Sequence, residues 1–416
     1  MPGRTWIYIL LVTACSINYI DRVVLSVSAQ PISKEFGIST IQLGYLFSAF
    51  LWSYLVFVLP WGIYVDRVGT RRATTVGMGI WSAATLLTGA SWNFGSAFAS
   101  RLLMGFGESS TYPAGGRAIR EWMPAGERGF ATTVFNCGGY IGPALGSVLM
   151  SYLVSDLGWR GAFFCAGGIG FLWLIFWSLV FRQPEEATFI GEEERAKILR
   201  ERGGKAVQGQ SAPMAALLKC KSMWGVFITQ GCAVYTVYLF LTWLPSYLQA
   251  TRGLTLLKTG LYTAIPYAVA VPGTILIGAL SDRLLRDVGV TSGRRRLMVV
   301  IMLLCSSGIL LTPWITETWI LLALFSVSLT SIGSAVGLNI TLTNDLLTNP
   351  GNAGRANGFL VTGGNLFGVL APIITGYVIS GTGSYDWAFV VAGTLLICGA
   401  VACWTMTREP ISPEAA

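Results

Sequence analysis

Apolar segments long enough to cross a lipid bilayer recur along the whole chain, and this feature restricts its fold most strongly. A helix needs about 20 apolar residues to cross the hydrocarbon layer. Charge clusters and Gly/Pro turns divide the 416 residues into about twelve such segments, and the expected fold class is therefore all-α integral membrane, with twelve transmembrane helices. The expected spans are 5–30, 40–64, 73–91, 94–120, 127–154, 159–181, 222–250, 257–282, 296–314, 317–342, 354–380 and 386–407.

Composition agrees with a membrane protein and argues against a nucleic-acid-binding one. Charged residues make up 12% of the chain, about half their usual share in soluble domains. The formal charge is +8, but the basic residues fall between apolar segments and are not clustered with stacking aromatics. We therefore expect contact with the lipid bilayer and no nucleic-acid partner.

Several kinds of chemistry are excluded by the residues that are missing. The chain has no histidine, which removes Ser-His-Asp catalysis and histidine proton relays. Its eight cysteines contain no CxxC pair, so we expect small core residues and no metal site. The sequence has no GxxxxGK[ST] phosphate loop. We expect no enzyme, no catalytic residue and no cofactor, with a proton gradient as the driving force.

The distribution of basic residues predicts the orientation in the membrane. With the N-terminus inside, 22 of the 28 Lys/Arg fall on the cytoplasmic side. Two lie within spans, and the four on the outer side are Lys34, Arg160, Arg252 and Lys258. By the positive-inside rule we expect both termini in the cytoplasm, in a multi-pass protein of the bacterial inner membrane.

One long polar stretch divides the chain into two halves. It runs from Arg182 to Lys221 and includes "EEERAKILRERGG", for which we expect a short amphipathic helix on the membrane surface. The expected domains are an N-terminal six-helix bundle (1–181), a cytoplasmic linker (182–221) and a C-terminal six-helix bundle (222–416).

The two halves repeat each other in sequence. "GIYVDRVGTRR" (Gly62–Arg72) and "GALSDRLLRDVGVTSGRRR" (Gly278–Arg296) both place Gly-x-x-x-Asp-Arg at the end of a span, before a basic cluster. "GERGFATTVFNCGGYIGPALG" (Gly126–Gly146) likewise resembles "GNAGRANGFLVTGGNLFGVLAPIITG" (Gly351–Gly376). Two parallel six-helix repeats with a site between them are typical of carriers that alternate between two open states.

The first of these motifs resembles the loop motif of the major facilitator superfamily, and the resemblance covers nearly the whole chain. It implies two six-helix halves of major facilitator type. It also implies that Asp66, Arg67 and Arg71 help to latch the halves together in the outward-open state. Asp282 and Arg283 occupy the equivalent positions of the second copy.

Four ionisable residues lie deep inside the expected spans: Asp21, Arg22, Arg101 and Glu108. A charge at the centre of a membrane helix costs roughly 2.5–3.5 kcal/mol unless it is paired or hydrated, so these groups should face the interior of the bundle. Helical spacing places Arg101, Gly105 and Glu108 on one face, and Gly105 would let a neighbouring backbone approach closely.

Two interpretations of these charges are open. In the first, two acids and two bases only neutralise each other as buried ion pairs, which are weak evidence for stability. In the second, the arginines are permanent cations and the acids gain and lose protons. An anionic substrate would then displace a carboxylate from an arginine, and the displaced acid would bind a proton, which couples the two movements.

The segments "NYIDR" and "RLLMGFGESSTYPAGGRAIREWMPAGERG" (Arg101–Gly129) resemble the anion:cation symporter family. This family includes carriers of sugar acids and other organic acids, and the vesicular glutamate transporters. By similarity to its galactonate carriers, Asp21 and Glu108 would be the proton-coupling residues, Arg22 would bind the substrate carboxylate and Arg101 would pair with the acids. The resemblance further implies that four residues line the substrate cavity: Tyr19, Tyr54, Asn136 and Asn365.

Other polar positions have two open interpretations each. Tyr235, Tyr238 and Thr242 lie three and four residues apart and could line a pocket, or could be ordinary core or lipid-facing side chains. In "GLNITLTNDLL" (Gly337–Leu347), the polar residues Asn339, Thr341, Thr343 and Asn344 could read substrate hydroxyls or support packing. Asp345 is expected to pair with Arg355.

The function expected from the sequence is proton-coupled symport of a small organic anion by alternating access, performed by a monomer. An organic-anion exchanger and an organophosphate:phosphate antiporter are alternatives. The antiporter typically needs an arginine in the seventh span, and Ser222–Ala250 has none. Outside transport, a receptor with a carrier fold is the remaining alternative, and it would give no counterflow of labelled substrate.

Overall fold

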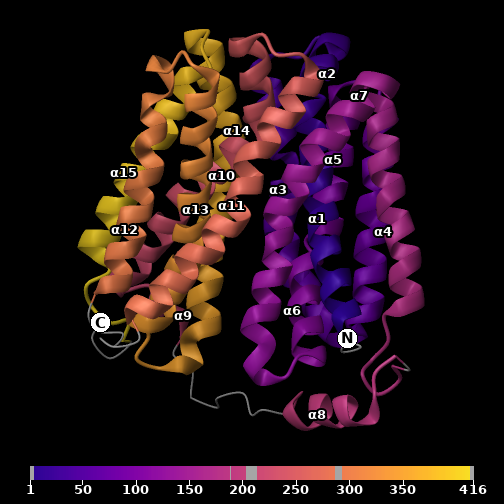
Figure 1. Cartoon of the computed structure of the whole chain (residues 1–416), viewed down its shortest axis with the longest axis vertical. Coiled ribbons are helices and arrows are strands. Elements are labelled where there is room, and N and C mark those ends of the chain that lie inside the picture. Colours follow the sequence, from indigo (N-terminus) through magenta and orange to yellow (C-terminus); the bar gives the residue numbers. More distant parts are fainter. Residues whose placement is uncertain (1–3, 188, 203–212, 286–292, 413–416) are drawn as a thin grey trace. The chain divides into compact units, whose positions relative to one another are not determined.

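The protein is helical throughout the part that the computed structural model describes, which comprises residues 4–187, 189–202, 213–285 and 293–412 (Figure 1). Within those ranges, nine helices are long and apolar enough to cross a membrane. The one extended pairing that these residues form is an isolated bridge between Leu347 and Ile411. The expected all-α integral membrane fold is confirmed.

The chain divides into two compact units, and the first comprises Met1–Lys205 and Leu254–Ala264. Within it α1 packs on α7, α4 on α5 and α7, and α3 on α5. Its elements are α1 (Thr5–Val27), α2 (Ala29–Phe36), α3 (Thr40–Val68), α4 (Thr70–Gly89), α5 (Phe94–Glu108), α6 (Thr111–Trp122), the 3-10 helix η1 (Ala125–Glu127), α7 (Arg128–Val180) and α8 (Glu192–Arg202).

The second unit comprises Ala206–Gly253 and Ile265–Ala416. In this unit α10 packs on α14 and α15, and α12 packs on α13 and α15. Its elements are α9 (Met214–Leu217), α10 (Lys221–Arg252), α11 (Leu256–Leu285, which begins within the first unit), α12 (Arg294–Ser306), η3 (Ser307–Trp314), α13 (Thr318–Leu346), η4 (Pro350–Asn352), α14 (Ala353–Thr382) and α15 (Asp386–Met406).

Some helix boundaries differ from those expected. The first span ends at Val27, and the separate short helix α2 follows it. The fifth and sixth spans form one helical run, α7, which is interrupted at Gly158. Gly158 has φ 72°, a left-handed conformation that glycine adopts without steric cost. The count of twelve spans stays a prediction, because it depends on how such joined and divided helices are counted.

A contact at the end of the sixth span holds α2 against the region of this interruption. The Arg160 guanidinium donates to Glu35 Oε1 (2.5 Å) and to the Ser91 carbonyl oxygen (3.0 Å). Trp159 Nε1 donates to Glu35 Oε2 (2.7 Å). Hydrogen bonds from these donors hold the pKa of Glu35 below its ordinary value of 4.5. The bond from the Trp159 indole has the largest effect, and the bond from Arg160 has the next largest. The Glu35 carboxylate therefore stabilises the first unit when it is ionised.

Glu35→Gln is expected to lower the melting temperature of the purified protein slightly at pH 7. The pKa of Glu35 is lower in the folded protein than in the unfolded chain. Its contribution to the stability of the fold is therefore present above pH 4.5 and is lost as the pH falls through the pKa of the folded state. An exposed ion pair contributes about 1 kcal/mol or less, so the shift should be a few degrees at most. Melting curves of both proteins should converge below pH 4.5, and a constant difference would contradict this role.

The linker helix differs in character from the expectation. A helix does form there, α8, and it lies at the end of the first unit that carries the N-terminus (Figure 1). It is polar rather than amphipathic, since Ile198 is its one buried residue. Ion pairs hold it, with Arg4 to Glu194 at 3.3 Å and Lys197 to Glu127 at 3.6 Å. The two glycines at the end of "EEERAKILRERGG" lie outside the described residues.

Candidate functional site

The expected fourth span is two helices, and their junction immediately follows Glu108. α5 ends at Glu108 and α6 begins at Thr111. The Ser109 and Ser110 hydroxyls donate back to the carbonyl oxygens of Phe106 (2.7 Å) and Gly107 (2.8 Å), and proline, which has no N–H, follows at Pro113. The sequence "ESSTYP" therefore places a buried acid at a helix junction.

The four ionisable residues come together in the interior of the first unit. Asp21 and Glu108 are 0% exposed, Arg101 is 1% exposed and Arg22 is 5% exposed. Asp21 and Arg22 come from α1, whereas Arg101 and Glu108 come from α5. The sequence prediction that these groups face the bundle interior agrees with this arrangement. Their roles in transport stay predictions.

Arg22 and Glu108 form the central ion pair of the cluster. Arg22 donates from Nε (3.0 Å) and Nη2 (2.9 Å) to the same carboxylate oxygen, Glu108 Oε2. The guanidinium also lies over the rings of Tyr19 (4.6 Å to the centroid) and Phe50 (4.7 Å). Glu108 Oε1 has no hydrogen-bond partner among the described residues. Arginine thus holds one carboxylate oxygen, and the buried Asn18 side chain lies beside the same carboxylate.

Arg101 does not pair with a carboxylate in the way that the sequence predicted. Its Nη1 donates to the backbone carbonyl oxygen of Asp21 (3.2 Å) and lies 2.8 Å from Met104 Sδ. The charge of Arg101 interacts with both acids, but its direct hydrogen bond goes to the backbone. Arg101 therefore supports the α1 backbone next to Asp21, with its charge close to both acids.

The Asp21 carboxylate faces neutral donors of α4 that the sequence prediction missed. Its two oxygens have no partner at hydrogen-bond geometry within the described residues. The Trp81 indole and the Thr85 hydroxyl lie beside it, and Trp81 Nε1 is itself without a described partner. Trp81 lies four residues after Gly77, and Thr85 lies four residues after Trp81, a spacing that marks one face of α4 but does not identify its neighbour.

Gly105 has the role that its position predicted. A Cβ atom at this residue would overlap the backbone carbonyl oxygen of Phe50 in α3. Ser53 of α3 donates its hydroxyl to the Leu102 carbonyl oxygen of α5 (2.5 Å), which joins the same two helices. The close approach brings the Phe50 ring beneath Arg22 and Arg101.

Gly105→Ala is expected to destabilise the protein by about 1–3 kcal/mol, because the added methyl group must push α3 and α5 apart. The measurement is the melting temperature of the detergent-solubilised protein. Gly168→Ala is the matched control, since a Cβ atom there meets nothing within 4 Å and alanine is the better helix former. Equal melting temperatures of the two variants would show that α3 and α5 tolerate the extra volume.

Tyrosines surround the arginine side of the cluster. Tyr54 lies with its ring centroid 5.9 Å from the Arg22 guanidinium carbon. The hydroxyl oxygens of Tyr19 and Tyr112 are 3.4 Å apart. Tyr112, which the sequence prediction missed, also lines an open groove with Asp66 and Arg117. Phenolic hydroxyls beside a guanidinium suit a ligand that carries both a carboxylate and hydroxyl groups.

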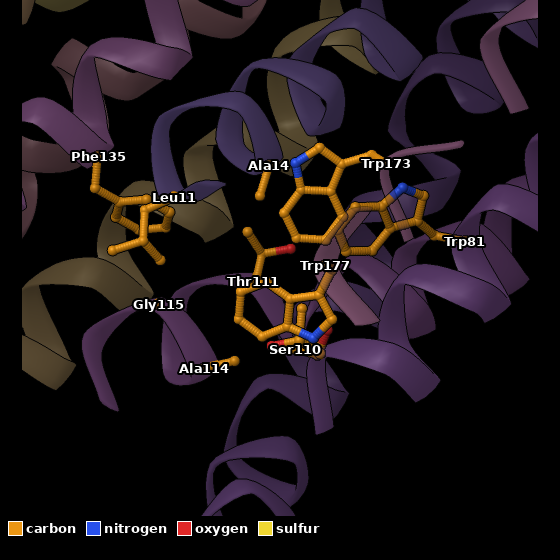
Figure 2. A pocket seen from close by; sticks show the side chains of 11 residues that line it. Leu11, Ala14, Trp81, Ser110, Thr111, Ala114, Gly115, Phe135, Trp173 and Trp177 are labelled. Atoms are coloured by element: carbon orange, nitrogen blue, oxygen red, sulfur yellow. The ribbon is translucent and has the colours of Figure 1, made fainter. Parts of the chain in front are cut away.

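A small cavity next to the cluster is too small for an organic acid. It has space for about one water molecule. Figure 2 shows its lining, in which the Trp173 and Trp177 rings stand near Thr111. Trp81 lines this cavity and also lies beside Asp21.

Three further residues that the sequence predicts to bind substrate lie on α7, α10 and α14. Asn136 is exposed on α7 and makes no hydrogen bond with the described residues. Tyr235 and Asn365 belong to the second unit, on α10 and α14. Tyr235 is 1% exposed, and its hydroxyl has no partner at hydrogen-bond geometry in the described part of the chain, although Thr375 lies beside it. Their assignment to the substrate site stays a prediction.

The first Gly-x-x-x-Asp-Arg motif makes contacts within its own unit. Asp66 lies 3.7 Å from Arg117 and 4.0 Å from Arg120 of α6. Arg71 donates to the Ser178 carbonyl oxygen at 2.8 Å, and Arg67 is exposed. The proposed latch between the halves is therefore untested, and the motif's observed contacts join α3 to α6 and α4 to α7.

The second copy of the motif corrects one predicted ion pair. Asp345 pairs with Arg295 of α12, where the sequence favoured Arg355. Arg295 also lies 3.9 Å from Asp282, so one guanidinium bridges two acids, and Arg283 is exposed. The prediction failed because Arg355 is nearer in sequence, whereas the packing of α12 on α13 decides which arginine reaches Asp345.

Two of the four polar residues of α13, Asn339 and Thr343, make packing contacts within the second unit. Asn339 is 0% exposed and donates to the Val226 carbonyl oxygen (2.9 Å) and to Gln230 Oε1 (3.0 Å) of α10. Thr343 donates back to the Asn339 carbonyl oxygen (2.8 Å). An amide pair between two membrane helices satisfies polar groups that lipid cannot.

Comparison with known proteins gives consistent matches along the chain. Residues 11–350 and 288–416 match the model of the Major Facilitator Superfamily. The chain is 30% identical to the probable galactarate/D-glucarate transporter of Bacillus subtilis (strain 168), with 98% of this chain and 92% of that protein covered. It is 32% identical to the probable sulfoacetate transporter of Cupriavidus necator (93% and 90% covered). It is 29% identical to the D-galactonate transporter of Escherichia coli O6:H1 (96% and 95% covered).

Solved structures show the same fold. The chain aligns with crystal structures of a bacterial homolog of the human lysosomal transporter Spinster, in inward-facing occupied and unoccupied conformations. The TM-scores are 0.73 and 0.77 at 18% identity; 98% and 99% of this chain, and 98% of each of those chains, are covered.

Proposed function

Because this chain belongs to the major facilitator superfamily, we propose that it is a secondary active transporter that couples the uptake of a small organic acid to protons. The substrate class is a carboxylate such as a sugar acid. The membrane is the bacterial inner membrane, both termini are cytoplasmic and the working unit is a monomer. The relatives named as galactarate/D-glucarate, D-galactonate and sulfoacetate transporters support this substrate class.

The observation that carries the proposal is the buried Arg22–Glu108 ion pair, in which one carboxylate oxygen accepts both guanidinium bonds. Burying such a pair of charges costs free energy, so its presence inside a membrane bundle indicates a functional role. The permanent charge of Arg22 suits a visiting carboxylate. Glu108 is the group that such a visitor would displace.

The proposed mechanism uses competition for Arg22. When the substrate carboxylate binds Arg22, it takes the two donors that Glu108 held, and Glu108 then accepts a proton because an unpaired buried carboxylate is unfavourable. Release of substrate on the other side frees Arg22. The protonated Glu108 side chain then loses its proton, and the resulting carboxylate binds Arg22 again. Asp21, buried beside Arg101 and Trp81, is the second acid proposed to bind a proton.

Counterflow in proteoliposomes tests the proposal. Liposomes loaded with unlabelled D-glucarate, D-galactonate or sulfoacetate should take up the same labelled acid transiently, and an inward proton gradient should increase its accumulation. Substrates for this assay come from a thermal-shift screen of organic acids. Counterflow that a proton gradient leaves unchanged would indicate an anion exchanger, and binding without counterflow would indicate a receptor.

A further inference from the structure

An apolar groove runs between α3 and α4 on the first unit, outside the charged cluster. Its lining is apolar throughout, and Tyr64 and Val76 on its two walls are 38% and 41% exposed. Trp61 turns its polar atom away from it, since Nε1 donates to the Phe106 carbonyl oxygen at 2.7 Å. The lining residues are Pro60, Trp61, Tyr64, Val76, Ile80 and Phe106.

Two arginines continue the walls of this groove beyond its end. Arg67 follows Tyr64 by three residues on α3, and Arg72 precedes Val76 by four on α4, so each arginine shares a helix face with a groove residue. Both are exposed, and neither makes a hydrogen bond or ion pair with the described residues. Arg71 between them differs, because it donates to the Ser178 carbonyl oxygen.

The dimensions fit one lipid chain. From Ile80 to Arg72 is eight residues, which at about 1.5 Å per residue is roughly 12 Å along α4. Half of the hydrocarbon core of a bilayer is about 15 Å thick. A chain that lies in the groove would therefore place its headgroup beside the two arginines, at the predicted cytoplasmic surface. Guanidinium groups bind phosphate oxygens well, and basic residues at this surface attract anionic lipids.

We propose that this groove binds one anionic phospholipid, with an acyl chain along Tyr64 and Val76 and the phosphate between Arg67 and Arg72. The charge of the site selects the headgroup, because two cations without described partners favour a net negative lipid over a zwitterionic one. The site is independent of the transported substrate. A lipid bound there would hold α3 against α5, because Trp61 of α3 donates to the Phe106 carbonyl oxygen of α5. Phe106 lies two residues before Glu108.

Lipid retention by the purified protein tests the site. The detergent-solubilised full chain is incubated with dioleoylphosphatidylglycerol or dioleoylphosphatidylcholine, and bound lipid is quantified by mass spectrometry. Wild-type protein should retain the glycerol lipid in preference to the choline lipid. Each of Arg67→Gln and Arg72→Gln should weaken retention about fivefold, and the double variant roughly thirtyfold. Val76→Phe, which fills the groove, should lower retention without changing charge.

A matched control removes two cations away from the groove. Lys219→Gln/Lys221→Gln neutralises exposed residues at the start of α10, and its lipid retention should equal that of wild type. Melting temperatures of all variants verify that they are folded. Equal retention of the two lipids by wild-type protein, unchanged retention by the double arginine variant, or the same loss in the lysine control would each overturn the proposal.

Discussion

Glu108→Gln is expected to abolish proton-driven accumulation of substrate while exchange of labelled substrate continues. Glutamine keeps the shape of the side chain and a carbonyl oxygen that still accepts from Arg22, but it cannot bind or release a proton. The coupling step is therefore lost, and the site that binds the acid is kept. The measurement is uptake into proteoliposomes with the pH lower outside, compared with counterflow at equal pH.

Glu121→Gln is the matched control for Glu108→Gln. Glu121 is also a buried acid of the first unit, 4% exposed, but it bonds to Arg117 (2.6 Å) and Thr70 (2.8 Å) outside the cluster. Its loss should change uptake and exchange together, because neither bond involves the proposed coupling residues. Gradient-driven accumulation at the wild-type level by Glu108→Gln would remove Glu108 from the coupling step.

Arg22→Lys is expected to weaken substrate binding at least tenfold. Arg22 directs two donors, Nε and Nη2, to one carboxylate oxygen and stacks over Tyr19 and Phe50. An ammonium group keeps the charge but supplies neither the paired donors nor the planar face. A bond to a charged group contributes about 1.5–3 kcal/mol, and 1.4 kcal/mol corresponds to a factor of ten.

Binding of the labelled acid to purified protein gives this affinity directly. Arg160→Lys is the control, because Arg160 bonds to Glu35 of α2, which is not part of the cluster, and has no proposed contact with substrate. It should bind substrate as wild type does. An unchanged affinity of Arg22→Lys would mean that the substrate carboxylate is held by another residue.

Local helix geometry was predictable from sequence spacing. A three-residue step, as from Tyr19 to Arg22, places both residues on one face of a helix, and the ring of Tyr19 does lie under the guanidinium. The position of Gly105 between two charges predicted a close helix approach, which α3 supplies through the Phe50 carbonyl oxygen. The superfamily assignment was likewise predictable, because the motif at Gly62–Arg72 is specific.

Contacts between helices were predicted less well. The partner of Arg22 is Glu108, 86 positions away, and Arg101 bonds to the backbone beside Asp21 rather than to a carboxylate. Trp81 beside Asp21 and Tyr112 beside Tyr19 were missed altogether. Their side chains are ordinary core residues in sequence, and only the rotation and register of α4 and α6 bring them to the cluster.

The sequence alone determined that this is an all-helical membrane protein of the superfamily and that four charges must avoid lipid. Both follow from the high cost of placing charges and unpaired backbone groups in hydrocarbon, a cost that any fold of this chain must satisfy. Tertiary structure decided which arginine holds which acid, that Asp345 pairs with Arg295, and which neutral groups surround Asp21. Those choices depend on how far each side chain reaches across the interface between packed helices, and helical periodicity carries no information about that distance.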